Sequence, residues 1–134
     1  MNEFKIINNY FKSLTKKNPS AKKLNDDVFF DKKKGVVISL DTYNSGTHFL
    51  GFKYPYYIIK KIIRSSLSDL ICKGVKPKYY FLSGGGNKQT FTKKNLSLIS
   101  KSLKEEQKKY SIIIGGGDTV YSKIPSFSVT TIGF

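Results

Sequence analysis

The sequence predicts an α+β domain in which helices cover one mixed sheet. Apolar residues recur at helical spacing in some segments and at strand spacing in others, which gives the order α-β-β-α-β-α-β-β without an internal repeat. The 134 residues fit one domain with a single core. Hydrophobic residues make up 39% of the chain, which suffices for a globular core. We therefore expect a single domain over residues 1–134.

The first part of the chain is predicted to form a helix followed by a β-hairpin. Apolar residues at helical spacing predict a short amphipathic helix over residues 2–15, and residues 15–23 have the composition of a loop. Aromatic and β-branched runs at residues 28–30 and 36–40 predict two strands. Asp31 lies between them and is expected to be an ordinary turn carboxylate.

The middle of the chain is predicted to contain a functional loop and a buried helix. Residues 43–55 are polar and contain glycine, which is typical of loops that carry function. After Pro55, apolar residues follow the i, i+3, i+4, i+7 spacing of a buried helix that ends near Gly74. We expect Cys72, inside this helix, to be a small buried hydrophobe. The expected stripe consists of Ile59, Ile62, Ile63, Leu67, Leu70 and Ile71.

The last part of the chain is predicted to form three strands and one helix. Residues 79–82 predict a strand that runs into a flexible glycine-rich loop at residues 83–87. Residues 93–109 predict a second helix. Residues 111–114 predict a buried strand, and alternation over residues 127–132 predicts a half-exposed final strand.

The charge of the chain is strongly positive. A net charge of +15 from 24 basic and 9 acidic residues would by itself suggest nucleic acid or an anionic membrane as partner. However, Arg64 is the only arginine, and arginine is favoured for bidentate contacts to guanine and phosphate. The lysines are spread from Lys5 to Lys123 rather than collected on one element. We therefore attribute the charge to overall composition, compatible with a phosphorylated ligand, and expect neither nucleic acid nor membrane as partner.

The sequence also predicts a soluble cytoplasmic protein. A single cysteine, Cys72, excludes an internal disulfide and fits a reducing compartment. The N-terminal segment lacks the basic region and apolar stretch of a signal peptide. No apolar run approaches membrane-spanning length.

The scarce aspartates give the strongest indication of function. Of six aspartates, Asp41, Asp69 and Asp118 follow apolar runs, and Asp26 and Asp27 form an adjacent pair. Asp69 lies at the margin of its helical stripe, where it could point into a cleft. Hard divalent cations such as Mg2+ need anionic oxygens from rigid supports. We therefore expect these five acids to gather around metal ions in one cleft.

Two glycine-rich segments and one histidine are further candidates. Residues 84–86 and 115–117 could bring backbone N–H groups close to phosphate oxygens, or could simply form turns, and neither matches a P-loop or dinucleotide fingerprint. The second has the stronger context, because Asp118 and Thr119 follow it. His48 is the only histidine, which excludes a zinc site with several histidine ligands. It is either a surface residue or a substrate contact.

Four motifs together resemble the N-terminal half of thiamine-monophosphate kinases. They are the acidic pair in LNDDVFF, the segment DTYNSGTHF, the aspartate of SSLSDL, and GGGDT ahead of the final SVTTIGF. The resemblance covers residues 2–134. It implies the N-terminal domain of the aminoimidazole ribonucleotide synthetase-like fold, with a mixed, mostly antiparallel sheet covered by helices. In that family two such sheets pair into a barrel, so a homodimer is expected.

The resemblance also implies an activity, the ATP-dependent phosphorylation of thiamine monophosphate to thiamine diphosphate with Mg2+ as cofactor. His48 would contact thiamine monophosphate, and Gly117 and Asp118 would lie against the nucleotide. No catalytic residue beyond the metal ligands is needed, because positioning and charge neutralisation suffice for phosphoryl transfer to a phosphate that is already anionic. The implied metal ligands are Asp26, Asp27, Ser39, Leu40 through its carbonyl, Asp41, Asp69 and Asp118.

The chain departs from that family at two motif positions. Ser66 stands where the family commonly has an asparagine. Glycines usually precede the acidic pair, whereas Lys23, Leu24 and Asn25 stand there here, which predicts a stiffer or differently shaped loop. The family also has a C-terminal domain that is absent here, so we expect this chain to be the ATP- and Mg2+-binding half, with weak or no kinase activity alone. Two other classes stay open: a basic nucleic-acid-binding module, which would bind without Mg2+, and a non-catalytic dimerisation domain.

Overall fold

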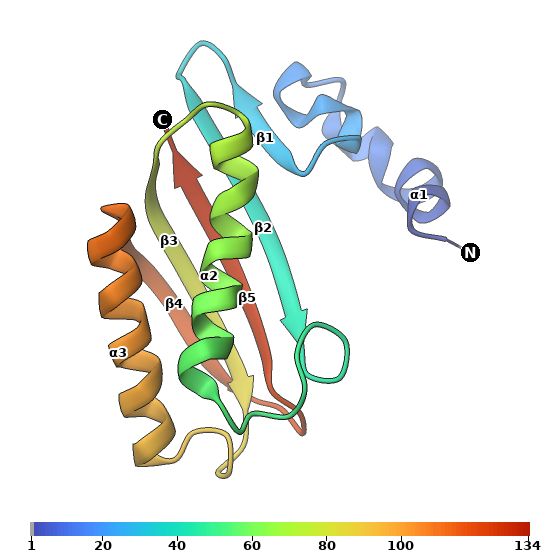
Figure 1. Cartoon of the computed structure of the whole chain (residues 1–134). Coiled ribbons are helices and arrows are strands. Elements are labelled where there is room, and N and C mark those ends of the chain that lie inside the picture. The colour runs from blue at the N-terminus through green and yellow to red at the C-terminus, as the bar shows by residue number, and fades with distance from the viewer. Residues whose placement is uncertain (1) are drawn as a thin grey trace.

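The computed structural model describes residues 2–134, and its core is a five-stranded sheet with two long helices on one face (Figure 1). The strands are β1 (Val28–Asp31), β2 (Val36–Asn44), β3 (Pro77–Gly86), β4 (Ile113–Tyr121) and β5 (Ser126–Gly133), and the two helices are α2 (Pro55–Cys72) and α3 (Lys93–Tyr110). Their order in the sheet is β1-β2-β5-β3-β4, in which only β3 and β4 are parallel neighbours. The predicted α+β class is therefore confirmed, as is the order of these elements.

The core lies between α2 and the central strands. Along β5, Phe127, Val129 and Thr131 are buried and the residues between them are partly exposed, as the two-residue period of a strand requires. Gly74 follows the helix with φ of 75°, the left-handed conformation that ends many helices. Within residues 2–134 no helix has the length and apolar character needed to cross a membrane. The helical residues buried against the sheet are Ile59, Ile62, Ile63, Leu67 and Leu70.

Ion pairs join α3 to α2. The Glu106 carboxylate is 1% exposed and accepts hydrogen bonds from Arg64 Nε at 2.9 Å, Arg64 Nη2 at 3.0 Å and Lys60 Nζ at 3.1 Å. Burial by itself would raise the pKa of Glu106, but the bonds from Arg64 and Lys60 lower it below its ordinary value. The single arginine of the chain therefore has a structural role between the two helices.

The predicted N-terminal amphipathic helix is wrong over most of its length. Only α1 (Glu3–Ile6) is α-helical, a π-helical turn covers Ile7–Phe11, and 3-10 turns cover Lys12–Thr15 and Pro19–Leu24. None of these residues is buried. The segment lies beside β1, away from α2 and α3 (Figure 1), so within residues 2–134 no core covers its apolar side. An apolar stripe at helical spacing was therefore not sufficient for a buried helix here.

Several strand predictions also need correction. The expected flexible loop at Gly84–Gly86 is instead the end of β3, because β4 pairs with all three glycines and β5 pairs with the first two. The strand predicted as buried at residues 111–114 is the edge strand β4, where Ile113 is 58% and Ile114 is 45% exposed. An edge strand has a neighbour on one side only, which accounts for that exposure.

Two residues at the end of α2 are exposed rather than buried. The structure contradicts the predicted burial of Ile71, which is 52% exposed, and of Cys72. Leu70 is fully buried, so the apolar stripe of α2 ends there. The two following residues point away from the sheet because the helix turns about 100° per residue.

Candidate metal and nucleotide site

Asp41 and Asp69 form a pair of neighbouring carboxylates where β2 meets α2. Asp41 pairs in register with the buried Val129 and so belongs to the helix-covered side of the sheet. Ser39 Oγ donates a hydrogen bond to Asp69 Oδ2 at 3.0 Å, and Tyr43 OH donates one to Asp41 Oδ2 at 3.3 Å. The structure thus places Asp69 at the helix margin, facing the sheet, as its position in the stripe predicted.

The negative charges of Asp41 and Asp69 repel each other. Partial burial raises the pKa of Asp41, and the charge of Asp69 together with a shared hydrogen bond raises it further. The charge of Asp27 acts in the same direction, whereas the bond from Tyr43 opposes it. A divalent cation at the pair would remove this repulsion. All the donors present are oxygens, the ligand type that Mg2+ prefers, so these residues fit that ion.

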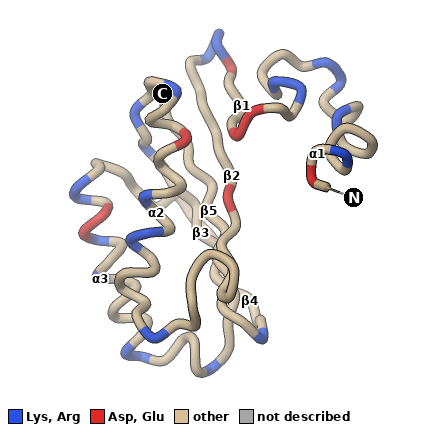
Figure 2. Tube along the Cα trace, turned by 45° about the vertical axis from the view of Figure 1, so that its right-hand side comes forward, with Lys and Arg blue, Asp and Glu red and all other residues tan. Residues whose placement is uncertain are grey.

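The structure separates the roles of Asp26 and Asp27. Asp26 Oδ2 accepts a hydrogen bond from Lys73 Nζ at 2.7 Å, and this bond lowers the pKa of Asp26. Asp27 is exposed, and its negative charge contributes to the raised pKa of Asp41. In Figure 2, acidic segments mark both the start of β1 and β2. Asp27 is therefore the better candidate ligand, because the carboxylate of Asp26 is already paired with the ammonium group of Lys73.

The backbone beside Asp41 is open on one edge. β1 pairs with β2 only as far as Ser39, so from Leu40 to Asn44 one edge of β2 has no neighbouring strand among residues 2–134. The Ser39 side chain is buried and already bonded to Asp69, and the Leu40 side chain is 65% exposed. This arrangement is compatible with the roles expected for the Ser39 hydroxyl and the Leu40 carbonyl.

Asp118 does not join the other acids. Asp41 pairs with Val129 of β5, Val129 with Leu82 of β3, and Leu82 with Gly117 of β4. Three strand spacings therefore separate β2 from β4, roughly 14 Å in all. Within residues 2–134, no three carboxylate, histidine or cysteine side chains are grouped so that they could hold a metal ion. The expected gathering of all five acids in one cleft is wrong for the single chain.

Asp118 instead borders a separate hollow of about 360 Å³. Its lining combines glycines, whose backbone is accessible, with apolar residues such as Leu82 and Ile99. Glycine is required at position 117, because φ is 155° and a Cβ atom would lie 1.9 Å from the carbonyl oxygen of Leu82. An accessible backbone and an apolar floor are features suited to a nucleotide. The polar side of the hollow consists of Gly116, Gly117, Asp118 and Thr119.

His48 is exposed in the loop after β2 and connects to the carboxylate pair through Tyr43. The Asn44 N–H donates to His48 Nδ1 at 2.9 Å, so in the neutral ring Nε2 carries the proton. The rings of His48 and Tyr43 meet edge to face, with centroids 5.6 Å apart. Tyr43 OH in turn bonds Asp41. The free Nε2–H therefore remains available to a ligand in the hollow of about 500 Å³ that His48 borders.

Tyr43 is a site residue that the sequence analysis missed. It is 9% exposed, and its hydroxyl also lies 3.0 Å from Ser66 Oγ on α2. A signal for it was available, because residues two apart on a strand share one face, and Tyr43 follows Asp41 by two.

Comparison with known proteins identifies the family. Residues 25–134 match the family described as AIR synthase related protein, N-terminal domain. A thiamine-monophosphate kinase of Buchnera aphidicola subsp. Schizaphis graminum is 35% identical over 125 residues, which cover 88% of this chain and 37% of that protein.

Solved structures agree with this match. The crystal structure of thiamine monophosphate kinase from Aquifex aeolicus gives a TM-score of 0.83 at 23% identity, covering 99% of this chain and 42% of that one. A structure of AaThiL complexed with AMPPCP and TMP gives a TM-score of 0.82 at 25% identity, covering 98% and 41%. This chain thus spans about two fifths of the length of these relatives. Because the family match extends over residues 25–134, the chain belongs to the AIR synthase related protein family and represents its N-terminal domain.

Proposed function

We propose that this chain is the ATP- and Mg2+-binding part of a thiamine-monophosphate kinase, which transfers a phosphoryl group from ATP to thiamine monophosphate. The pair of Asp41 and Asp69 carries the proposal, because a divalent cation would relieve the repulsion between two adjacent, partly buried carboxylates. The relatives named thiamine-monophosphate kinase, and the AaThiL structure complexed with AMPPCP and TMP, support the choice of substrates.

Each residue near the pair has a defined part in this proposal. Asp41, Asp69 and Asp27 hold Mg2+, which when bound neutralises phosphate oxygens. Ser39 and Tyr43 orient the two carboxylates through their hydrogen bonds. His48 donates from Nε2 to the phosphate of thiamine monophosphate. A general base is unnecessary, since a phosphate monoester with a second pKa of about 6 is largely dianionic at neutral pH.

The β4 hollow supplies the nucleotide contact in this proposal. Gly117 offers its backbone beside the apolar floor, and Asp118 follows it at the border of the same hollow. Because β5 and β3 lie between β2 and β4, Asp118 of the same chain acts on a different part of the nucleotide from Asp41.

Binding of AMPPCP with and without Mg2+, measured by calorimetry on the 134-residue chain, tests this function. Asp41→Asn and Asp69→Asn are each expected to weaken Mg2+-dependent binding at least tenfold, since a hydrogen bond or contact to a charged group contributes about 1.5–3 kcal/mol. Asp31→Asn is the matched control. Asp31 is the last residue of β1 and accepts a hydrogen bond from the Lys34 N–H of the following turn at 3.1 Å. Its substitution should leave binding unchanged.

Three results would contradict the proposal. Binding at wild-type strength by both Asp41→Asn and Asp69→Asn would exclude the metal assignment. Tight, salt-sensitive binding of RNA without Mg2+, in place of AMPPCP binding, would favour the nucleic-acid module. If the chain bound neither AMPPCP nor RNA, a non-catalytic dimerisation domain would be favoured.

We also propose that two copies pair through the sheet face not covered by helices. That face carries large exposed apolar side chains, among them Leu40 at 65% and Ile113 at 58% exposure. Leu40→Lys is expected to shift the molar mass in light scattering from dimer to monomer, because pairing would bury the new charge. Leu50→Lys makes the same change at an 86% exposed leucine in the loop after β2 and should leave the mass unchanged. A monomeric wild type would refute the pairing.

A further inference from the structure

A pocket formed by the N-terminal segment is lined by several basic side chains. Its volume is about 1130 Å³, slightly above the usual range of about 300–1,000 Å³ for ligand sites. The residues that line it include no aspartate or glutamate. Among residues 2–134, the ion pairs involve only Lys60, Arg64 and Lys73 as cations, so these pocket lysines are not neutralised by carboxylates. The basic residues that line the pocket are Lys12, Lys16, Lys17, Lys22 and Lys23.

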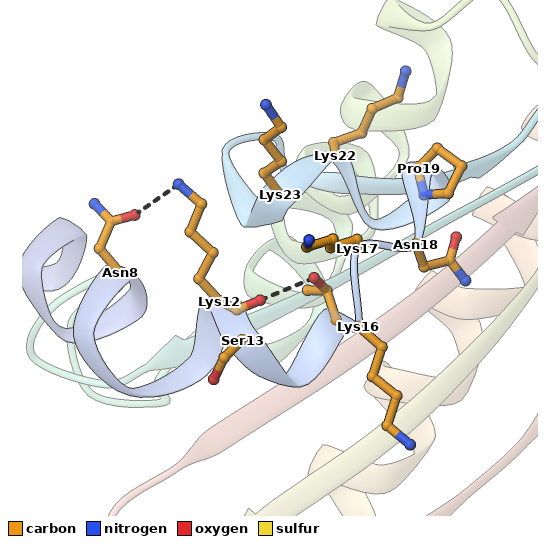
Figure 3. Close-up of a pocket in the computed structure, with 10 residues that line it drawn as sticks. Asn8, Lys12, Ser13, Lys16, Lys17, Asn18, Pro19, Lys22 and Lys23 are labelled. Atoms are coloured by element: carbon orange, nitrogen blue, oxygen red, sulfur yellow. Dashed lines mark hydrogen bonds between the residues drawn. The ribbon is translucent and has the colours of Figure 1, made fainter.

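Several of these lysines face one opening. Figure 3 shows the side chains of Lys12 and Lys17 beside the same space, with the Lys23 side chain rising from its far side, whereas Lys16 points away from it. The Lys22 ammonium lies over the ring of Phe30, 5.3 Å from its centroid. The hydrogen bond from Lys12 Nζ to Asn8 Oδ1 is long, at 3.5 Å, and an ammonium has three donors. Most donors in the pocket are therefore free to meet an anion.

The backbone that positions these lysines is unusual. Lys16, Lys17, Lys22 and Lys23 have φ of 50°, 61°, 52° and 55°, a left-handed conformation that is unfavourable for residues with a Cβ atom. Left-handed residues stand on either side of residues 18–21, Lys16 and Lys17 before them and Lys22 to Leu24 after them. These turns bring Lys12, Lys17 and Lys23 to one pocket. Unfavourable backbone conformations of this kind cluster at binding sites. Several lysines that repel one another add a second cost, which a bound anion would remove.

We propose that this pocket binds a compact polyanion with at least two phosphate groups, and that it does so without a divalent metal. Lysine presents a point charge with several donors, which suits clustered phosphate oxygens. The site goes beyond the proposed kinase function, because neither Asp41 nor Asp69 lines the pocket. A small group of lysines on one short segment fits a short polyphosphate better than an extended nucleic acid, which needs a basic surface along its length.

Calorimetry with inorganic tripolyphosphate, at low salt and with EDTA present, tests this site on the 134-residue chain. The wild type is expected to bind, and binding should weaken as salt is added. The double variant Lys17→Gln and Lys23→Gln should bind at least tenfold more weakly, because two charge-assisted contacts are lost. Both side chains belong to exposed residues, so the fold should be retained, as circular dichroism would show. Lys12→Gln provides an independent variant with the same expected direction.

The matched control is the double variant Lys32→Gln and Lys33→Gln. These lysines are also consecutive and exposed, in the β1–β2 turn, and their loss changes the net charge by the same amount. Equal weakening by this control, or no binding by the wild type, would overturn the site. The site would not recognise phosphate groups alone if, with EDTA present, ATP bound more than tenfold more tightly than tripolyphosphate. Tighter binding of single-stranded RNA than of tripolyphosphate would contradict the proposal in the same way. Asp41→Asn should bind tripolyphosphate like the wild type, so this site and the kinase function can fail separately.

Discussion

Glu106→Gln is expected to lower the free energy of unfolding by about 3 kcal/mol. Hydrogen bonds to charged groups contribute about 1.5–3 kcal/mol, and the upper value applies because the Glu106 carboxylate is buried and accepts several of them, although the Arg64 side chain is 43% exposed. The carboxylate is 1% exposed and bonds both Arg64 and Lys60. Urea denaturation at pH 7 measures the effect.

Glu105→Gln is the matched control, one position earlier on α3. Glu105 also bonds Lys60, at 2.8 Å, but its side chain is 41% exposed, so the loss should be clearly smaller than for Glu106→Gln. Equal losses for the two variants would show that burial does not determine the strength of this network.

The Glu106 prediction has a pH dependence with a definite sign. The pKa of Glu106 is lower in the folded protein than its ordinary value of 4.5. The ionised carboxylate therefore contributes stability above pH 4.5, and that stability is lost as the pH falls through the lower folded value. Below about pH 4.5 the wild type should lose stability more steeply than Glu106→Gln. Parallel curves for the two proteins would contradict the assigned direction of the shift.

Gly117→Ala is expected to cost about 3 kcal/mol and to loosen the pairing of β3 with β4. A Cβ atom at this position would lie 1.9 Å from the carbonyl oxygen of Leu82, which belongs to the backbone and cannot rotate away. Overpacking typically costs about 1–3 kcal/mol, and φ of 155° adds strain for any residue with a Cβ atom. Hydrogen exchange of the β4 amides would report the local loss, and urea denaturation the total.

Gly51→Ala separates the two contributions to this cost. Gly51 also has a left-handed φ, of 52°, but nothing lies within 4 Å of an added Cβ atom. Only the conformational cost, about 1–2 kcal/mol, should remain. A loss for Gly117→Ala no greater than that for Gly51→Ala would rule out the predicted clash with β3.

Local periodicity predicted the parts of the fold that depend on one segment at a time. The helix predicted over residues 93–109 is observed as Lys93–Tyr110, and the helix predicted between Pro55 and Gly74 is observed as Pro55–Cys72. The prediction failed where a neighbouring strand determines the conformation. Gly84–Gly86 have the composition of a loop, yet pairing with β4 and β5 holds them in a strand.

The candidate site was predictable in part for the same reason. Asp41 and Asp69 are brought together because one lies on the covered face of β2 and the other at the margin of the helix above it, and both positions follow from periodicity. The burial of Glu106 also had a signal, because it lies seven residues after the buried Ile99 on one helical stripe. A charged residue in that stripe shows its role only once Arg64 is known to lie opposite.

The sequence by itself determined the α+β class, the two long helices, the family and the candidacy of Asp41 and Asp69, because these depend on short-range spacing and on motifs. Only the tertiary structure decided that Asp118 lies apart, that Lys73 holds Asp26, and that separated lysines line one pocket. Strand order is a long-range property: placing β5 and β3 between β2 and β4 separates acids whose motifs look alike. Left-handed turns at lysine positions likewise cannot be inferred from periodicity, since their backbone is unfavourable for those residues.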